Sequence, residues 1–113
     1  MLIVATELHV RNFWKFIPFV KYSTRSTKQA KKAEGCLHVW VGNKGWRIGY
    51  TLTAWKDKAS MQHYRNTGPH KEAMQQIANL SKQYKTLVWE AEQLPDWKDA
   101  KAKLDEIAFK QLK

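Results

Sequence analysis

His70 is the residue whose position in the sequence most clearly favours chemistry. It follows a Gly-Pro pair, which predicts a sharp turn and the start of a helix. It is in helical phase with Ala73, Met74 and Ile77, so we expect its side chain to face inward beside an apolar stripe. A helix N-terminus disfavours the imidazolium cation, and a neutral imidazole could act as a general base or bind a metal. The alternative is a structural histidine hydrogen-bonded to the backbone.

Tyr64 and Arg65 are the next candidates for a catalytic role. The phenol of Tyr64 could orient a phenolic or carbonyl substrate, and the guanidinium of Arg65 could hold an anionic oxygen. The plainer interpretation places Tyr64 in the core and Arg65 on the surface. With His70 they form the predicted catalytic set.

Four further residues are predicted to line a substrate pocket, namely Trp55, Trp40, His38 and Met74. Indole rings line pockets and interfaces but also fill cores, so core packing of both tryptophans is an equal alternative. His38 alternates with Cys36 and Trp40, which predicts that these three side chains share one face of a strand.

Metal binding is not expected from the spacing of the potential ligands. His9 ends the first predicted strand and could approach His38 if the two strands are neighbours, but no His-x-x-x-His or Cys-x-x-Cys spacing occurs. Cys36 is the only cysteine, so no disulfide can form within the chain, and a reducing, cytoplasmic location is expected. No segment approaches the roughly 18 apolar residues of a membrane span and no signal peptide is evident, so we expect no membrane partner.

These candidates depend on the elements that must position them. Hydrophobic patterns predict strands over residues 2–10, 37–41, 46–55 and 84–91, with a turn at 42–45. Helices are predicted over 13–33, from Asp57 to about residue 66, from the Gly-Pro pair at 68–69, and over 97–108 after a cap at Asp96. The order predicts an α+β fold, a ferredoxin-like split βαβ with an antiparallel sheet and an extra C-terminal helix, in one domain over residues 1–113.

The strands also predict self-association. Residues 39–41 and 87–89 are apolar at consecutive positions, so both faces of the sheet carry apolar side chains. Helices in the split βαβ arrangement are expected to cover one face only. A second copy of the sheet would cover the other, which predicts a homodimeric α/β barrel with a pocket between each sheet and its own helices.

The charge of the chain suggests a second class of function. Lys and Arg number 20 against 10 Asp and Glu, giving a formal net charge of +10. Lys21, Arg25, Lys28 and Lys32 form one basic stripe along the first helix, which invites anionic ligands or nucleic acid. An RNA-recognition module needs stacking aromatics on its first and third strands; Tyr50 could serve on the third, but the first strand offers none. Nucleic-acid binding is therefore ranked below the dimeric barrel.

The stretch TLTAWKDKASM at 51–61, the pair Tyr64-Arg65 and the stretch GPHKEAM at 68–74 resemble the dimeric α/β-barrel superfamily. Within it the sequence is similar to antibiotic-biosynthesis-monooxygenase-like domains, where a strand ending in Trp and a helix-capping Asp precede an aromatic residue and a His. The segment LPDW at 94–97 is similar to the tail of a spheroidene-monooxygenase-like branch. The resemblance implies a small monooxygenase-like oxidoreductase, although the superfamily also contains isomerases, haem-degrading enzymes and proteins without known activity.

The sequence departs from the haem-degrading members of this superfamily. Met74 stands where those members carry a His, Tyr64 stands where they carry a Trp, and the first strand has no Asn before Asn12. Haem degradation by their mechanism is therefore not expected, while haem binding through another histidine remains open.

Two functions follow as hypotheses. The first is a monooxygenase-like enzyme acting on an apolar or aromatic substrate, either without a dedicated cofactor or with borrowed haem or flavin. His70 would be its base or ligand, and Tyr64 and Arg65 would orient the substrate. The second is a non-catalytic binding module for an anionic ligand or nucleic acid that uses the basic helix.

Overall fold

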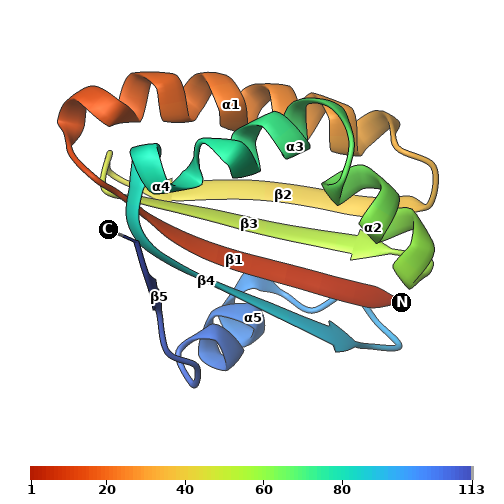
Figure 1. Ribbon diagram of the computed structural model, residues 1–113. Helices are drawn as coiled ribbons and strands as arrows, with labels where there is room; N and C mark the ends of the chain where they lie inside the picture. The colour runs from red at the N-terminus through yellow and green to blue at the C-terminus, as the bar shows by residue number, and fades with distance from the viewer. Residues whose placement is uncertain (113) are drawn as a thin grey trace.

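The computed structural model describes residues 1–112, which form one antiparallel sheet with helices on both of its faces (Figure 1). The strand order is β2-β3-β1-β4-β5. The strands are β1 (Leu2–Val10), β2 (Cys36–Lys44), β3 (Ile48–Trp55), β4 (Ser81–Glu90) and β5 (Lys110–Gln111). The helices are α1 (Phe13–Lys32), α2 (Lys58–Arg65), α3 (Gly68–Gln75), α4 (Ile77–Leu80) and α5 (Trp97–Leu104). The predicted ferredoxin-like α+β fold with an extra C-terminal helix is confirmed.

Capping residues explain where the principal helices begin. Asn12 accepts a hydrogen bond from the Lys15 backbone N–H at 3.1 Å through its side chain, and Asp57 does the same for Ser60 at 2.8 Å. Asp96 caps α5 in the same way. Each cap satisfies a backbone donor that the first helical turn leaves unpaired. The caps predicted at Asp57 and Asp96 are confirmed.

Several boundaries differ from the sequence-based prediction. β2 continues to Lys44, through most of the predicted turn at 42–45, so the hairpin reverses only from Gly45, whose φ of +59° favours glycine. β4 begins at Ser81 because that residue pairs with Val10 past a register shift in β1. The last helix ends at Leu104 rather than at 108, and the chain then turns back so that β5 adds to the edge of β4.

The two faces of the sheet are covered by different helices. α1, α3 and α4 lie over one face, and α5 lies across the other (Figure 1). The face under α5 is tightly filled by side chains that are almost completely buried, namely Ile3, Ala5, Leu52, Ala54, Ala100 and Leu104. The ring of Trp40 on β2 stacks on that of Trp97 on α5, with centroids 4.7 Å apart.

The position of α5 corrects the argument for a homodimer. The sequence suggested that helices leave one face open for a second copy, but α5 of the same chain packs on that face. The amphipathic stripe of α5 supplies Ala100 and Leu104, which are fully buried, as the cover. A second copy is therefore not required to bury this face, and the homodimer stays a prediction.

A polar cluster borders the apolar side chains beneath α5. Glu7 is buried, with Oε1 3.0 Å from Lys101 Nζ and Oε2 2.7 Å from His9 Nε2. Lys85 is also buried, 4.0 Å from the Asp105 carboxylate and with its ammonium 4.3 Å from the ring of Phe109. Burial alone would raise the pKa of Glu7, but the hydrogen bonds from His9 and Lys101 and the charges of Lys101 and Lys85 outweigh it and lower that pKa.

Candidate functional site

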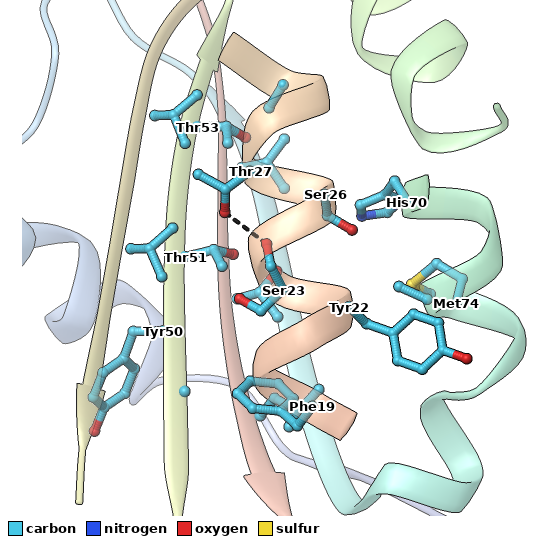
Figure 2. A pocket seen from close by; sticks show the side chains of 18 of the residues that line it. Phe19, Tyr22, Ser23, Ser26, Thr27, Tyr50, Thr51, Thr53, His70 and Met74 are labelled. Atoms are coloured by element: carbon cyan, nitrogen blue, oxygen red, sulfur yellow. Dashed lines mark hydrogen bonds between the residues drawn. The ribbon is translucent and has the colours of Figure 1, made fainter. Parts of the chain in front are cut away.

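A cavity of about 530 Å³ lies between the sheet and the helices α1 to α4. Its floor is the sheet face opposite α5, and its other walls come from the helices (Figure 2). A volume of this size can hold a drug-sized organic molecule. Aliphatic and aromatic side chains dominate the lining, and hydroxyl groups are set among them.

Threonines of three neighbouring strands form the polar part of the floor. Thr6, Thr51, Thr53 and Thr86 all face the cavity, because β1 pairs Thr6 with both Thr51 and Thr86 in register. Thr6 Oγ1 and Thr86 Oγ1 are 3.0 Å apart, and Thr53 Oγ1 accepts a hydrogen bond of 2.9 Å from Trp55 Nε1. These threonines were not among the predicted pocket residues, although Thr at every second position of a strand indicates one hydroxyl-bearing face.

The α1 wall carries further hydroxyl-bearing residues, among them Ser23, Ser26 and Thr27 (Figure 2). Thr27 Oγ1 donates a hydrogen bond of 2.8 Å to the Ser23 carbonyl oxygen one turn earlier. The hydroxyl of Ser26 is buried and has no hydrogen-bond partner among residues 1–112. A buried polar atom without a partner costs free energy, so this hydroxyl is an unfavourable feature of the wall beside the cavity. Ser and Thr inside a helix are unfavourable, which is the signal that could have found them.

His70 sits half-buried in the wall between α1 and α3 (Figure 2). Its Nδ1 is 3.3 Å from the carbonyl oxygen of Arg65, and its ring centroid is 4.6 Å from that of Tyr64. A carbonyl oxygen can only accept, so Nδ1 carries the proton and Nε2 keeps its lone pair. Burial lowers the pKa of His70, the charge of Arg65 lowers it further, and the bond to the carbonyl opposes both. The lowered pKa favours the neutral imidazole near pH 7, with burial as its largest cause.

Gln29 of α1 holds the segment that carries His70 in place. Its Oε1 accepts a hydrogen bond of 2.8 Å from the His70 backbone N–H. Its Nε2 donates to the carbonyl oxygens of Tyr64 at 3.1 Å and Thr67 at 2.8 Å. One side chain thus ties α1 to the end of α2 and the start of α3, and it fixes the backbone from which His70 projects.

Tyr64 and Arg65 differ sharply in their surroundings. Tyr64 is buried, its ring packs against Trp55 at 5.0 Å, and its hydroxyl donates to the Ser26 carbonyl oxygen at 3.2 Å. Burial raises the pKa of Tyr64, so its proton stays in place at neutral pH. Arg65 is exposed at the edge of the cavity.

The predicted pocket residues divide between the two sides of the sheet. Trp55 and Met74 line the cavity, Trp55 completely buried and Met74 with 39% of its surface exposed. Trp40 and His38 pair with Leu52 and Ala54, so they face α5 and do not reach the cavity. This corrects the prediction for both residues, since β2 presents its alternate residues to the cavity instead.

A bulge at the start of β2 changes the predicted alternation. The register with β3 shifts between Cys36 and His38, so these two side chains do not share a face as expected. Cys36 instead packs with the cluster around Trp55, on the cavity side. His9 and His38 do not approach each other, because β3 lies between their strands.

The side chains of residues 1–112 do not suit the binding of a metal ion or the mechanism of the haem-degrading proteins. Within residues 1–112, no group of three or more His, Cys, Asp or Glu side chains could hold a metal ion. Met74 and Tyr64 take the places of the His and Trp of haem-degrading proteins, and the Tyr64 hydroxyl is committed to the Ser26 carbonyl. The residues present do not fit that mechanism, so we derive no step through haem.

The comparison with solved structures defines the fold class of this cavity-bearing chain. A candidate antibiotic biosynthesis monooxygenase from Nitrosomonas europaea superposes with a TM-score of 0.73 at 11% identity, covering 82% of this chain and 100% of that one. One from Deinococcus radiodurans gives 0.73 at 14% identity, covering 85% and 97%. No protein-family model matches the sequence, and no curated protein is significantly similar to it. The resemblance to antibiotic-biosynthesis-monooxygenase-like domains is confirmed at the level of the fold.

A third similar structure is that of a protein described as an oxygenase. SnoaB, a cofactor-independent oxygenase from Streptomyces nogalater, superposes with a TM-score of 0.67 at 10% identity, covering 82% of this chain and 94% of that one. The narrower resemblance to the spheroidene-monooxygenase-like branch stays a prediction. Among the described helices, none is long and apolar enough to cross a membrane.

Proposed function

We propose that this protein is a small cofactor-independent monooxygenase that binds an apolar or aromatic substrate in the cavity. The observation that carries the proposal is the cavity itself, which combines an apolar lining, a row of hydroxyl groups and one neutral histidine. Its fold is shared with a protein described as a cofactor-independent oxygenase, although identity is only 10%. Fold alone does not determine function, so the site must carry the argument.

The site residues can supply the steps that such a reaction needs. Nε2 of His70 removes a proton from an activated CH₂ or phenolic position of the substrate. The resulting anion gives its electrons to molecular oxygen and forms a hydroperoxide. Loss of water then leaves a carbonyl group, so one oxygen atom enters the product, the other leaves as water, and the substrate supplies both electrons and both protons.

The other candidates have different roles in this proposal. The Arg65 guanidinium, at the cavity edge, stabilises the anionic oxygen that develops after proton removal. Tyr64 acts as a positioning residue, because its hydroxyl is bonded to Ser26 and its ring supports His70. The threonines of the floor orient polar groups of the substrate.

Oxygen uptake with a probe phenol such as 1-naphthol tests the proposal, with a chelator present and no cofactor added. His70→Gln is expected to lower turnover by about 10²–10⁴-fold, the usual contribution of a general base. His63→Gln is the matched control, since His63 lies exposed on α2 and does not line the cavity. Unchanged turnover in His70→Gln would contradict the proposal, and so would a His70→Ala variant that loses stability but keeps its affinity for 1-naphthol.

The surroundings of Tyr50 do not support the alternative that the protein is an RNA-binding module. The ring of Tyr50 packs against Trp97 at 4.9 Å, and its side chain points away from the cavity (Figure 2). Since α5 covers that sheet face, Tyr50 is not free to stack on a base. We further propose that the chain acts as one domain, as a homodimer and in the cytoplasm.

A further inference from the structure

An exposed apolar surface lies at the end of the molecule where α1 begins. Phe13, Trp14, Ile17 and Val20 are 52%, 75%, 64% and 42% exposed, and their spacing places them along one side of α1. Trp46, from the β2–β3 connection, meets Phe13 edge-on with ring centroids 5.8 Å apart. We call these five residues the aromatic ridge. Contiguous apolar side chains of this size on a surface mark an interaction site.

A basic depression of about 260 Å³ lies next to the aromatic ridge. Arg11, Arg47 and Lys82 contribute to its lining together with Trp46, and no Asp or Glu does. The Arg47 guanidinium is 5.2 Å from the centre of the Trp46 ring, so the cations and the ridge are in contact. None of the three cations forms an ion pair with a carboxylate within residues 1–112.

The guanidinium of Arg11 is held in place from one side. Its Nη2 donates to the carbonyl oxygens of Ala78 at 2.8 Å, Ser81 at 3.0 Å and Leu112 at 3.3 Å. These carbonyls neutralise no net charge, so the depression remains positive. Glu7, on the same strand as His9, is buried and already bonded to His9 and Lys101.

We propose that this end of the protein docks on the surface of an anionic phospholipid bilayer. The aromatic ridge enters the interfacial region of the bilayer, and the basic depression meets lipid phosphates. Trp and Phe beside Lys and Arg are the side chains that such interfaces favour. The net charge of +10 attracts the whole protein to an anionic surface.

Charge argues against a second copy of this chain as the occupant. In a two-fold symmetric contact through the ridge, the basic depressions of two chains would be brought together. Each chain also carries a net charge of +10, which adds to the repulsion. Single-stranded nucleic acid could stack on the rings of the ridge but would leave the exposed aliphatic side chains of Ile17 and Val20 without an apolar partner, which a bilayer interface supplies.

The proposed docking goes beyond the proposed reaction and does not depend on it. It differs from the sequence-based expectation of no membrane partner, which considered spanning segments and targeting signals only. The N-terminal half of α1 contributes to both proposed sites, because Phe16 and Phe19 line the cavity while Trp14 and Ile17 are exposed on the surface. The two proposals are separable, because vesicle binding requires no turnover.

Co-sedimentation with vesicles tests the docking. The wild-type protein is expected to bind vesicles of equal parts phosphatidylcholine and phosphatidylglycerol, and not vesicles of phosphatidylcholine alone. Trp14→Ser with Ile17→Ser should weaken this binding by at least roughly tenfold, because two interfacial anchors are lost. The control is Leu37→Ser, a residue 56% exposed at the start of β2 and outside the ridge. It should bind like the wild type.

Charge variants examine the basic depression separately. Arg47→Gln and Lys82→Gln should each weaken binding about fivefold at low salt, the usual contribution of one basic residue near an anionic membrane. Lys98→Gln, which removes an exposed charge from α5, is the matched control. The loss should disappear at high salt, where such charges are screened.

Four results would overturn the proposal. The first is a wild-type protein that does not bind the anionic vesicles. The second is binding that inorganic phosphate alone removes, which would make free phosphate the ligand. The third is light scattering in which Trp14→Ser converts a dimer to a monomer, which would make the ridge a contact between two copies. The fourth is tighter binding to single-stranded DNA than to vesicles, lost in the same variant.

Discussion

The two faces of the sheet are built from alternate residues of the same strands, yet one is filled and the other is hollow. On β1, Ile3 and Ala5 point to the filled face and are completely buried, while Val4 and Thr6 point to the cavity. The filled face has α5 in direct contact with the strands. The hollow face has a cavity of about 530 Å³ between the strands and the helices α1 to α4.

Packing at its two ends holds the cavity open. At one end Trp55, Met61 and Tyr64 form a buried cluster between the sheet and the helices. At the other end the Phe19 ring rests on Gly49, where an added Cβ would lie 2.6 Å from the ring. A larger residue at position 49 would displace the ring. One face of the sheet is thus filled by core side chains, and the other combines a buried cluster at one end with an open cavity.

Shortening a side chain on the filled face should give the largest effect. Leu104 is completely buried beneath α5, so Leu104→Ala is expected to lower the free energy of unfolding by about 2–5 kcal/mol. Val41 faces the cavity and is 43% exposed, so Val41→Ala should cost less than about 1 kcal/mol. Urea denaturation measures both, and equal losses would contradict the contrast between the faces.

Enlarging a side chain should have opposite consequences on the two faces. Ala54 is completely buried against α5, and Ala54→Leu should cost about 1–3 kcal/mol through overpacking. Thr51 faces the cavity, and Thr51→Leu should change stability by less than about 1 kcal/mol because space is available. The same variant should reduce binding of the fluorescent probe 8-anilinonaphthalene-1-sulfonate. A Thr51→Leu protein that binds the probe normally would show that the probe lies elsewhere.

The smallest expected effect is electrostatic. Because the pKa of Glu7 is lowered in the folded protein, its contribution to stability is full above its unfolded pKa of about 4.3 and is lost as pH falls toward the folded value. Glu7→Gln should therefore flatten the decline in stability between about pH 5 and pH 3, as read from urea midpoints. A decline as steep as that of the wild type would exclude Glu7 as its source.

An ion pair on the other side of the molecule is the control for Glu7. Arg25 and Glu72 join α1 to α3 with 3.1 Å between Nη2 and Oε2, but both side chains are about half exposed. Arg25→Gln should change the free energy of unfolding by less than about 1 kcal/mol, as is usual for exposed pairs. A larger loss would indicate that the pair braces the helices around the cavity.

Much of the fold could be predicted from local signals. The strand 2–10, the caps at Asp57 and Asp96, and the element order all follow from spacing and turn residues, and the structure confirms them. That α5 covers the second face of the sheet could not be predicted. The apolar stripe of the last helix indicates that one side of this helix is buried, but it does not identify the surface on which the helix packs. The short β5 has no pattern of its own and exists only because β4 offers a free edge.

The candidate site was predicted in part. His70, Tyr64 and Met74 do reach one cavity, because helical phase identifies the inward side of α3 and α2. Trp40 was assigned to the wrong face because apolar residues on both sides of β2 hide which side is the cavity. The threonine floor was missed since Thr is common in strands for reasons of β-propensity alone.

The central place of β1 sets a condition on how the newly made chain can fold. β1 pairs with β3 on one side and with β4 on the other, so the second edge of β1 stays unpaired until residues 81–90 have been made. At about 5–20 residues per second, the apolar segment of β1 stays without its second partner for on the order of ten seconds. Ribosome-bound chains that end before β4 would expose one edge of β1, and chaperones that bind extended apolar segments would act there.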